Sequence, residues 1–215
     1  MRAAWAASRP ARPLLRRRLH TIHRRRNTYV EQPWANGRGV TREIAADRGA
    51  SITEAPFQWR LSIAALAPPG GPFSEIPGVD RVLTLLDGEL ALAVGEGAPL
   101  APLRVGEPFG PFPADGPTDS RVRVAGSDLN VMWDRRRACA DVAVAGAGAA
   151  IVDADTVFFV GLDPAEAVVR AGDGDVRLAY LDSHEVAAEP PGGADMAVVA
   201  GRALVVRFST RKTAR

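Results

Sequence analysis

Few residues in this sequence could hold a transition metal or activate a nucleophile. The chain has three histidines and a single cysteine, Cys139. His20 and His23 lie in an arginine-rich segment near the amino terminus, and His184 stands by itself near the carboxyl terminus. A transition-metal site needs several ligands that converge on one point, and a catalytic triad needs a base beside its nucleophile. The sequence therefore predicts no metal, no cofactor and no Ser–His–Asp or Cys–His centre.

Other catalytic and targeting signals are equally sparse. The stretch Gly37-Arg38-Gly39 does not have the spacing of a dinucleotide-binding fingerprint, and we find no phosphate-binding loop. Acidic residues are plentiful but none is paired in a diagnostic way, so a metal-independent carboxylate mechanism stays open. One cysteine gives no internal disulfide, and no apolar run reaches the roughly 18–20 residues that span a bilayer. We expect a soluble, cytoplasmic protein.

Two short segments place polar side chains in rows that could line a pocket. Residues 57–63 (FQWRLSI) alternate apolar and polar side chains, which is the period of a β-strand. Residues 128–133 (DLNVMW) alternate in the same way. One face would carry Gln58, Arg60 and Ser62, and the second polar row would be Asp128, Asn130 and Met132. These rows either face water or line a shared pocket inside a β-structure, and we expect the pocket. Arg60 is its natural anion anchor because a planar guanidinium matches a carboxylate.

The elements that would position these rows are strands. Residues 81–94 are expected to form a hairpin that turns at Asp87-Gly88, a strong turn signal. Further strands are expected at 139–145, 151–160, 165–170, 176–181 and 196–208. The 17 prolines and 21 glycines interrupt every long helical window. The pattern predicts an all-β protein, either a sandwich, a barrel or a jelly roll. We expect Asp80 and Arg81 to form a local ion pair or turn bond.

Charge is distributed unevenly along the chain. Residues 1–26 contain nine arginines and no acidic residue, which leaves 18 basic against 25 acidic residues in the remainder. This leader could be a nucleic-acid-binding arm, a transit-type peptide or a disordered segment. We expect it to be disordered, with the folded domain at residues 27–215. Because the body is acidic, we expect neither nucleic acid nor a membrane as a partner.

Four segments together resemble the HutD/Ves family. They are residues 34–43 (WANGRGVTRE), 57–64 (FQWRLSIA), 71–81 (GPFSEIPGVDR) and 128–132 (DLNVM). The resemblance implies a cupin-like double jelly roll with few short helices, in two jelly-roll-like halves. It also implies a bacterial protein tied to histidine utilisation or to a stress response. A catalytic cupin usually gathers two or three histidines and a glutamate around a metal, and this sequence lacks that set.

The resemblance, read with the polar rows, implies a non-catalytic protein that binds a small carboxylate such as urocanate or N-formylglutamate and modulates histidine utilisation. The residues that we assign to the pocket are Arg60, Asn36, Thr41, Glu43, Ser62, Ser74, Asp128, Asn130 and Met132. A metal-independent enzyme that acts on a small polar acid is the alternative, and a protein-interaction module is the third hypothesis. A homodimer is compatible with all three.

Overall fold

The computed structural model describes residues 18–33, 39–49, 55–151, 154–172, 174–189 and 195–211. Within these ranges the regular structure is β-strand apart from one 3-10 helix, η1 (Arg26–Thr28). The all-β prediction is confirmed. No helix in the described part of the chain is long and apolar enough to cross a membrane.

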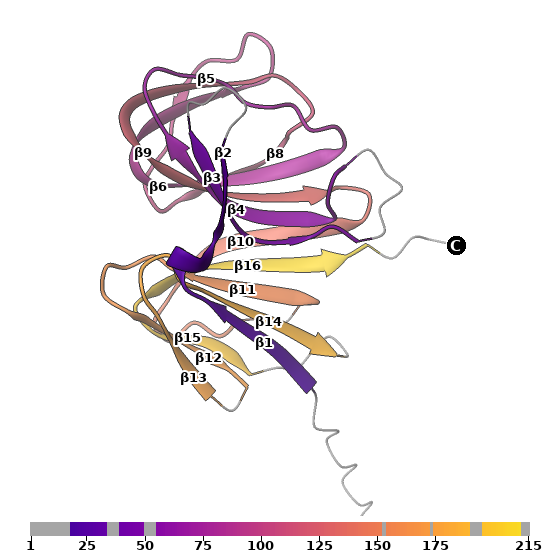
Figure 1. The fold of residues 1–215 in the computed structure, drawn as a ribbon, viewed down its shortest axis with the longest axis vertical. Coiled ribbons are helices and arrows are strands. Elements are labelled where there is room, and N and C mark those ends of the chain that lie inside the picture. The colour runs from indigo at the N-terminus through magenta and orange to yellow at the C-terminus, as the bar shows by residue number, and fades with distance from the viewer. Residues whose placement is uncertain are drawn as a thin grey trace, which may run out of the picture.

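The first half of the chain forms one large antiparallel sheet, drawn in the upper part of Figure 1. Its strands lie in the order β2, β3, β4, β9, β6 and β7, and β5 and β8 pair with β9 and β6. The strands are β2 (Val30–Pro33), β3 (Val40–Asp47), β4 (Trp59–Leu66), β5 (Gly70–Pro72), β6 (Val79–Val94), β7 (Ala101–Pro102), β8 (Pro108–Pro113) and β9 (Thr118–Asp134).

The second half of the chain, together with the amino-terminal strand β1, forms two further sheets, drawn in the lower part of Figure 1. A five-stranded sheet has the order β1, β14, β11, β16 and β10, and a three-stranded sheet has the order β13, β12 and β15. The strands are β1 (Arg18–Arg24), β10 (Ala138–Gly146), β11 (Thr156–Gly161), β12 (Ala167–Ala171), β13 (Gly174–Leu178), β14 (Ser183–Glu189), β15 (Met196–Ala200) and β16 (Arg202–Thr210).

The core that joins the two halves lies between their large sheets. Trp59 of β4 stacks on Phe208 of β16, with ring centroids 4.7 Å apart. Leu61 and Ile63 are buried in the same cluster as Trp59, as the alternation of this segment predicted. The apolar face of β4 is therefore used for packing between the halves, and its opposite face looks into the first half.

The expected hairpin at Asp87-Gly88 is wrong. Residues 79–94 form the single strand β6, which pairs with β9 along its length. Gly88 does have a positive φ of 84°, but the chain does not reverse there. Instead, the register of the pairing between β6 and β9 shifts around it. The Asp-Gly pair thus marks an irregularity at which β6 and β9 bend together. The single strand expected at 196–208 is also wrong. This segment forms two strands, β15 and β16, which belong to different sheets.

The amino-terminal segment departs from the expectation of a disordered leader, because residues 18–26 are part of the fold. β1 pairs with β14 over seven residues. Arg24 Nη1 lies 2.7 Å from the Glu185 carboxylate, and the Arg26 N–H donates to Asp182 at 2.8 Å. Leu19 packs against the core of the second half. The sequence of this segment has no apolar alternation that would have indicated a strand. Residues 1–17 lie outside the described ranges.

Candidate functional site

The register of the first sheet brings most of the predicted pocket residues onto one face. Ser62 of β4 lies opposite Glu43 of β3 and Asn130 of β9. Directly facing residues in an antiparallel pair share a face, so these three side chains form one polar row across three strands. Thr41 and Asp128 extend the row on one side, since both lie opposite Ala64. Ser62, Asp128 and Asn130 are all buried, so this row does not face water.

Arg60 is held by groups of the chain itself. Its Nε donates to Glu43 Oε2 at 2.8 Å, and its Nη2 donates to Gln32 Oε1 at 3.0 Å. Glu43 has a second cation, because Arg48 Nη2 lies 2.9 Å from both carboxylate oxygens. The Arg60 and Glu43 side chains are 19% and 11% exposed, so this end of the polar row reaches the surface. Gln32 was not identified from the sequence, because its contact with Arg60 depends on the pairing of β2 with β3.

Asp128 is a buried carboxyl group with few partners. Asn130 Nδ2 donates to its Oδ1 at 2.7 Å, and the backbone of Ala64 supplies a further hydrogen bond. Burial raises the pKa of Asp128 to about 7, against the opposing effects of the Arg81 charge and of these hydrogen bonds. Asp128 can therefore gain or lose a proton near neutral pH, unlike an ordinary surface aspartate.

Arg81 belongs to the same face and was missed as a pocket residue. It lies opposite Met132 of β9, and it is only 6% exposed. Its guanidinium carbon is 5.1 Å from the centre of the Phe73 ring. Its Nε has no hydrogen-bond partner, and no carboxylate of the described residues lies within 4.0 Å of the guanidinium. Burial lowers the pKa of Arg81 to about 10, although the charge of Asp128 opposes that effect.

The expected local pair of Asp80 and Arg81 is wrong because neighbouring residues of a strand point to opposite faces. Asp80 instead pairs with Arg135, at 2.9 Å.

The sequence around Arg81 does indicate that its side chain could be buried. β6 is apolar on both faces, with Val82 and Leu86 in the core between the halves and Leu83 in the core of the first half. Arg81 lies between Val79 and Leu83 on one of these faces, and both neighbours are buried.

The remaining predicted site residues are Met132, Ser74 and Asn36. Met132 is buried on the same face, between Arg60 and Arg81. Ser74 is exposed in the connection between β5 and β6, so the structure does not bring it into the row. Asn36 lies outside the described residues.

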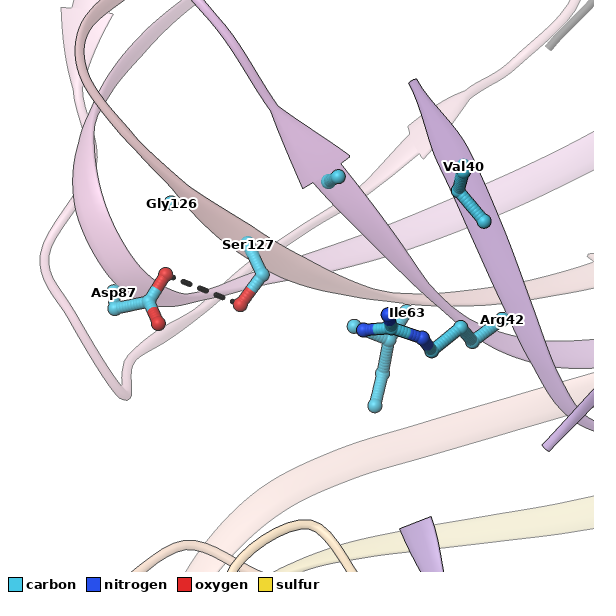
Figure 2. A pocket seen from close by; sticks show the side chains of 7 residues that line it. Val40, Arg42, Ile63, Asp87, Gly126 and Ser127 are labelled. Atoms are coloured by element: carbon cyan, nitrogen blue, oxygen red, sulfur yellow. Dashed lines mark hydrogen bonds between the residues drawn. The ribbon is translucent and has the colours of Figure 1, made fainter. Parts of the chain in front are cut away.

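Two surface hollows lie apart from the polar row. The first, of about 220 Å³, is shown in Figure 2 and is lined by Val40, Arg42, Ile63, Ala65, Asp87, Gly126 and Ser127. Val40, Arg42 and Ile63 alternate with residues of the row, so this hollow opens on the opposite face of the sheet. Ser127 donates to Asp87 there at 3.1 Å.

The second hollow, of about 260 Å³, lies beside Pro77, Gly78 and Arg135. Arg135 is already bound by Asp80 and Asp115. We therefore take the buried row, and neither hollow, as the candidate site.

The chemistry available in the row is anion recognition. Two guanidinium groups, one carboxyl group of raised pKa and an amide converge on one face of the sheet. Such groups bind carboxylates by charge and by directional hydrogen bonds. Within the described residues, no three His, Cys, Asp or Glu side chains lie close enough together to hold a metal ion.

Comparison with protein families and curated proteins gives a consistent match. The family model described as HutD matches residues 26–205. Protein Ves from Cronobacter sakazakii is 41% identical over 117 residues, which cover 52% of this chain and 60% of that protein. A 21.2 kDa protein from the hutC 3′ region of Pseudomonas putida is 34% identical over 116 residues, covering 53% and 58%. The chain thus spans somewhat less than two thirds of these curated relatives.

Solved structures support the same fold. HutD from Pseudomonas fluorescens SBW25, determined in a formate condition, superimposes with a TM-score of 0.77 at 28% identity. That match covers 90% of this chain and all of that one. Salicylate 1,2-dioxygenase from Pseudoaminobacter salicylatoxidans matches with a TM-score of 0.53 at 9% identity, covering 94% and 84%, and so shares only the fold. The architecture is therefore cupin-like.

Proposed function

Because the chain belongs to the HutD family, we propose that it is a non-catalytic protein that binds a small carboxylate and modulates histidine utilisation. Urocanate and N-formylglutamate are the candidate ligands. The site is the buried row of the first sheet, with Arg81 as the open cation and with Arg60, Ser62, Asp128 and Asn130 around it.

The observation that carries this proposal is the state of Arg81. Arg81 is only 6% exposed, its Nε is buried without a hydrogen-bond partner and its guanidinium carbon lies over the Phe73 ring, and a buried cation that lacks a paired anion is costly. An incoming carboxylate would provide both the missing charge and the missing acceptor. We predicted Arg60 as the anchor. The Arg60 guanidinium already donates to Glu43 and Gln32, so Arg81 is the better candidate for the first contact with a ligand carboxylate.

One observation favours a second function, a metal-independent enzyme acting on a small polar acid. The pKa of Asp128, raised to about 7, suits a general acid or base at neutral pH. In that case Arg81 would orient the substrate carboxylate, and Asp128 would exchange a proton with it. Analysis of the recovered ligand after incubation separates the two functions, because a binding protein returns it unchanged.

The test of the binding function is calorimetric titration of urocanate and N-formylglutamate into three proteins. They are the wild type, Arg81→Met, and Arg104→Met as a control at an exposed arginine whose ion-pair partner is Glu107. Arg81→Met should weaken binding by about 2–5 kcal/mol, the usual effect of removing one partner of a buried charged contact. Arg104→Met should bind as the wild type does. Failure of the wild type to bind either acid, or equal binding by Arg81→Met, would overturn the proposal.

A further inference from the structure

Two histidines lie side by side on one face of the five-stranded sheet, in the second half of the molecule. His184 of β14 is opposite His23 of β1 on one side and opposite Phe159 of β11 on the other. Directly facing residues in an antiparallel pair share a face, and Phe159 belongs to the buried cluster of the second half. Both imidazole rings therefore project toward that cluster, with their centroids 6.2 Å apart.

His184 is a buried polar side chain without a partner. It is only 4% exposed, and neither of its ring nitrogens has a hydrogen-bond partner among the described residues. Such a ring is unfavourable, because its donor and its acceptor have both lost their contacts with water. Burial, together with the nearby His23, also lowers the pKa of His184, so at neutral pH the ring is uncharged and keeps a free lone pair.

The surroundings of this pair favour a cation. The His23 side chain is 35% exposed, so an ion can reach the pair from solvent. One oxygen of the Asp182 carboxylate lies 3.9 Å from His23 Nε2, and the other accepts the N–H of Arg26. A carboxylate beside a ligating imidazole orients the ring and supplies negative charge near the bound ion.

We propose that His23 and His184 together bind one divalent transition-metal ion of the zinc, nickel and copper class, with water completing its coordination. Imidazole nitrogen is a preferred ligand of these ions. Two imidazoles on one ion, with metal–nitrogen bonds of about 2.0–2.1 Å, have ring centroids roughly 5–6 Å apart, so the observed pair needs only a small rotation. Within the described residues no third His, Cys, Asp or Glu side chain completes a set, so this is a two-histidine site.

The site depends on β1 and lies apart from the polar row of the first sheet. The family match begins at residue 26, so His23 falls outside it. The sequence predicts no metal on the premise that His23 lies in a disordered leader, and the pairing of β1 with β14 removes that premise. An ion bound to one side chain from each strand would also hold β1 against β14.

The test is calorimetric titration of Zn²⁺, Ni²⁺ and Cu²⁺ into the full chain without an added histidine tag. The wild type should bind one equivalent of at least one of these ions, with Cu²⁺ the tightest. Mg²⁺ and Ca²⁺ should not bind, because they prefer oxygen ligands. His23→Gln and His184→Gln should each weaken binding by about tenfold or more, since even the outer partners of a metal site contribute that much.

Two control variants should bind the ions as the wild type does. His20→Gln removes an exposed histidine on the other face of β1, and Cys139→Ser removes the exposed thiol, which could itself take these ions. Electron paramagnetic resonance of the Cu²⁺ complex gives a second measurement. It should show two imidazole nitrogens on the copper of the wild type and one in His23→Gln.

The bound ion should also raise the melting temperature of the wild type but not that of His23→Gln. If melting curves show that His184→Gln does not fold, His23→Gln on the edge strand decides the question. A wild type that takes up no stoichiometric ion, or equal binding by His23→Gln, would overturn the inference. Loss of binding in His20→Gln or Cys139→Ser would place the ion elsewhere and would overturn it as well.

Discussion

His23 on β1 and His184 on β14 lie directly opposite each other, with ring centroids 6.2 Å apart. His184 is buried, and neither of its ring nitrogens has a hydrogen-bond partner among the described residues. His23 Nε2 lies 3.9 Å from the carboxylate of Asp182. The histidine that stands alone in the sequence thus has a neighbour, supplied by the segment expected to be disordered.

This histidine pair predicts a loss of stability in mild acid. Burial, together with the nearby His23, lowers the pKa of His184 below its ordinary 6.5. The folded state then binds fewer protons than the unfolded chain, so stability is intact above about pH 6.5 and falls as the pH drops toward the folded pKa. Melting temperatures at pH 7.5 and 5.5 should differ more for the wild type than for His184→Gln, which cannot titrate.

The matched control is His20→Gln, because His20 is exposed on the other face of β1. It should show the wild-type difference between the two pH values. A similar decrease in all three proteins would assign the acid sensitivity to other groups.

The pairing of β1 with β14 predicts that residues 18–26 stabilise the fold. A chain of residues 27–215 loses seven strand pairings, the Arg24–Glu185 ion pair and the Arg26–Asp182 hydrogen bond. It also leaves β14 as an open edge, which favours association. Compared with residues 18–215, it should melt several degrees lower, on the order of 2–4 °C for each kcal/mol lost. Equal melting temperatures would show that β1 is dispensable.

The amino-terminal segment also illustrates how the sequence misled us. Residues 18–24 pair with β14, but their sequence shows no apolar alternation, because Leu19 and Ile22 are three residues apart and fall on opposite faces of the strand. The composition of a segment indicates whether its side chains favour water. It does not indicate whether a distant strand such as β14 has an unpaired edge with which the segment can form hydrogen bonds.

Some features of the candidate site could be predicted from local sequence pattern, and others depend on which strands pair. The alternation of residues 57–63 placed Trp59 and Leu61 in the core correctly, because that pattern is local. The contact of Arg60 with Gln32 could not be predicted, because it needs the pairing of β2 with β3. The Asp87-Gly88 signal predicted a hairpin turn, which is wrong: Gly88 has a positive φ, but the chain continues in β6 and the pairing with β9 only shifts register there.

The bend itself predicts one position that tolerates no side chain. A Cβ atom added at Gly126 would lie closer to the backbone oxygen of Asp87 than atoms can approach. Gly126→Ala must therefore move β9 away from β6 at the bend, and we expect a loss of about 2 kcal/mol or more in the free energy of unfolding. Denaturant unfolding measures it. Gly146→Ala is the control, because a Cβ there meets nothing within 4 Å. Equal stability of both variants would mean that the bend is easily rearranged.

The raised pKa of Asp128 predicts that ligand binding depends on pH. In the free protein this pKa is about 7, so the carboxyl group is partly protonated at neutral pH. A ligand carboxylate on Arg81 would bring a second negative charge near Asp128 and would favour its protonated form further. The complex would then bind more protons than the free protein, so affinity should rise as the pH falls from 8 to 6. The slope has an upper limit of about tenfold per pH unit for one linked proton. Calorimetry in buffers of different ionisation enthalpy should detect proton uptake with the acid that binds.

Asp128→Asn keeps the shape of the side chain and its contact with Asn130 but cannot titrate, so its affinity should not change over this pH range. Asp119→Asn, at an exposed position of β9, should retain the wild-type slope. A wild-type affinity that does not change between pH 6 and 8, or an equal slope in Asp128→Asn, would separate Asp128 from the ligand.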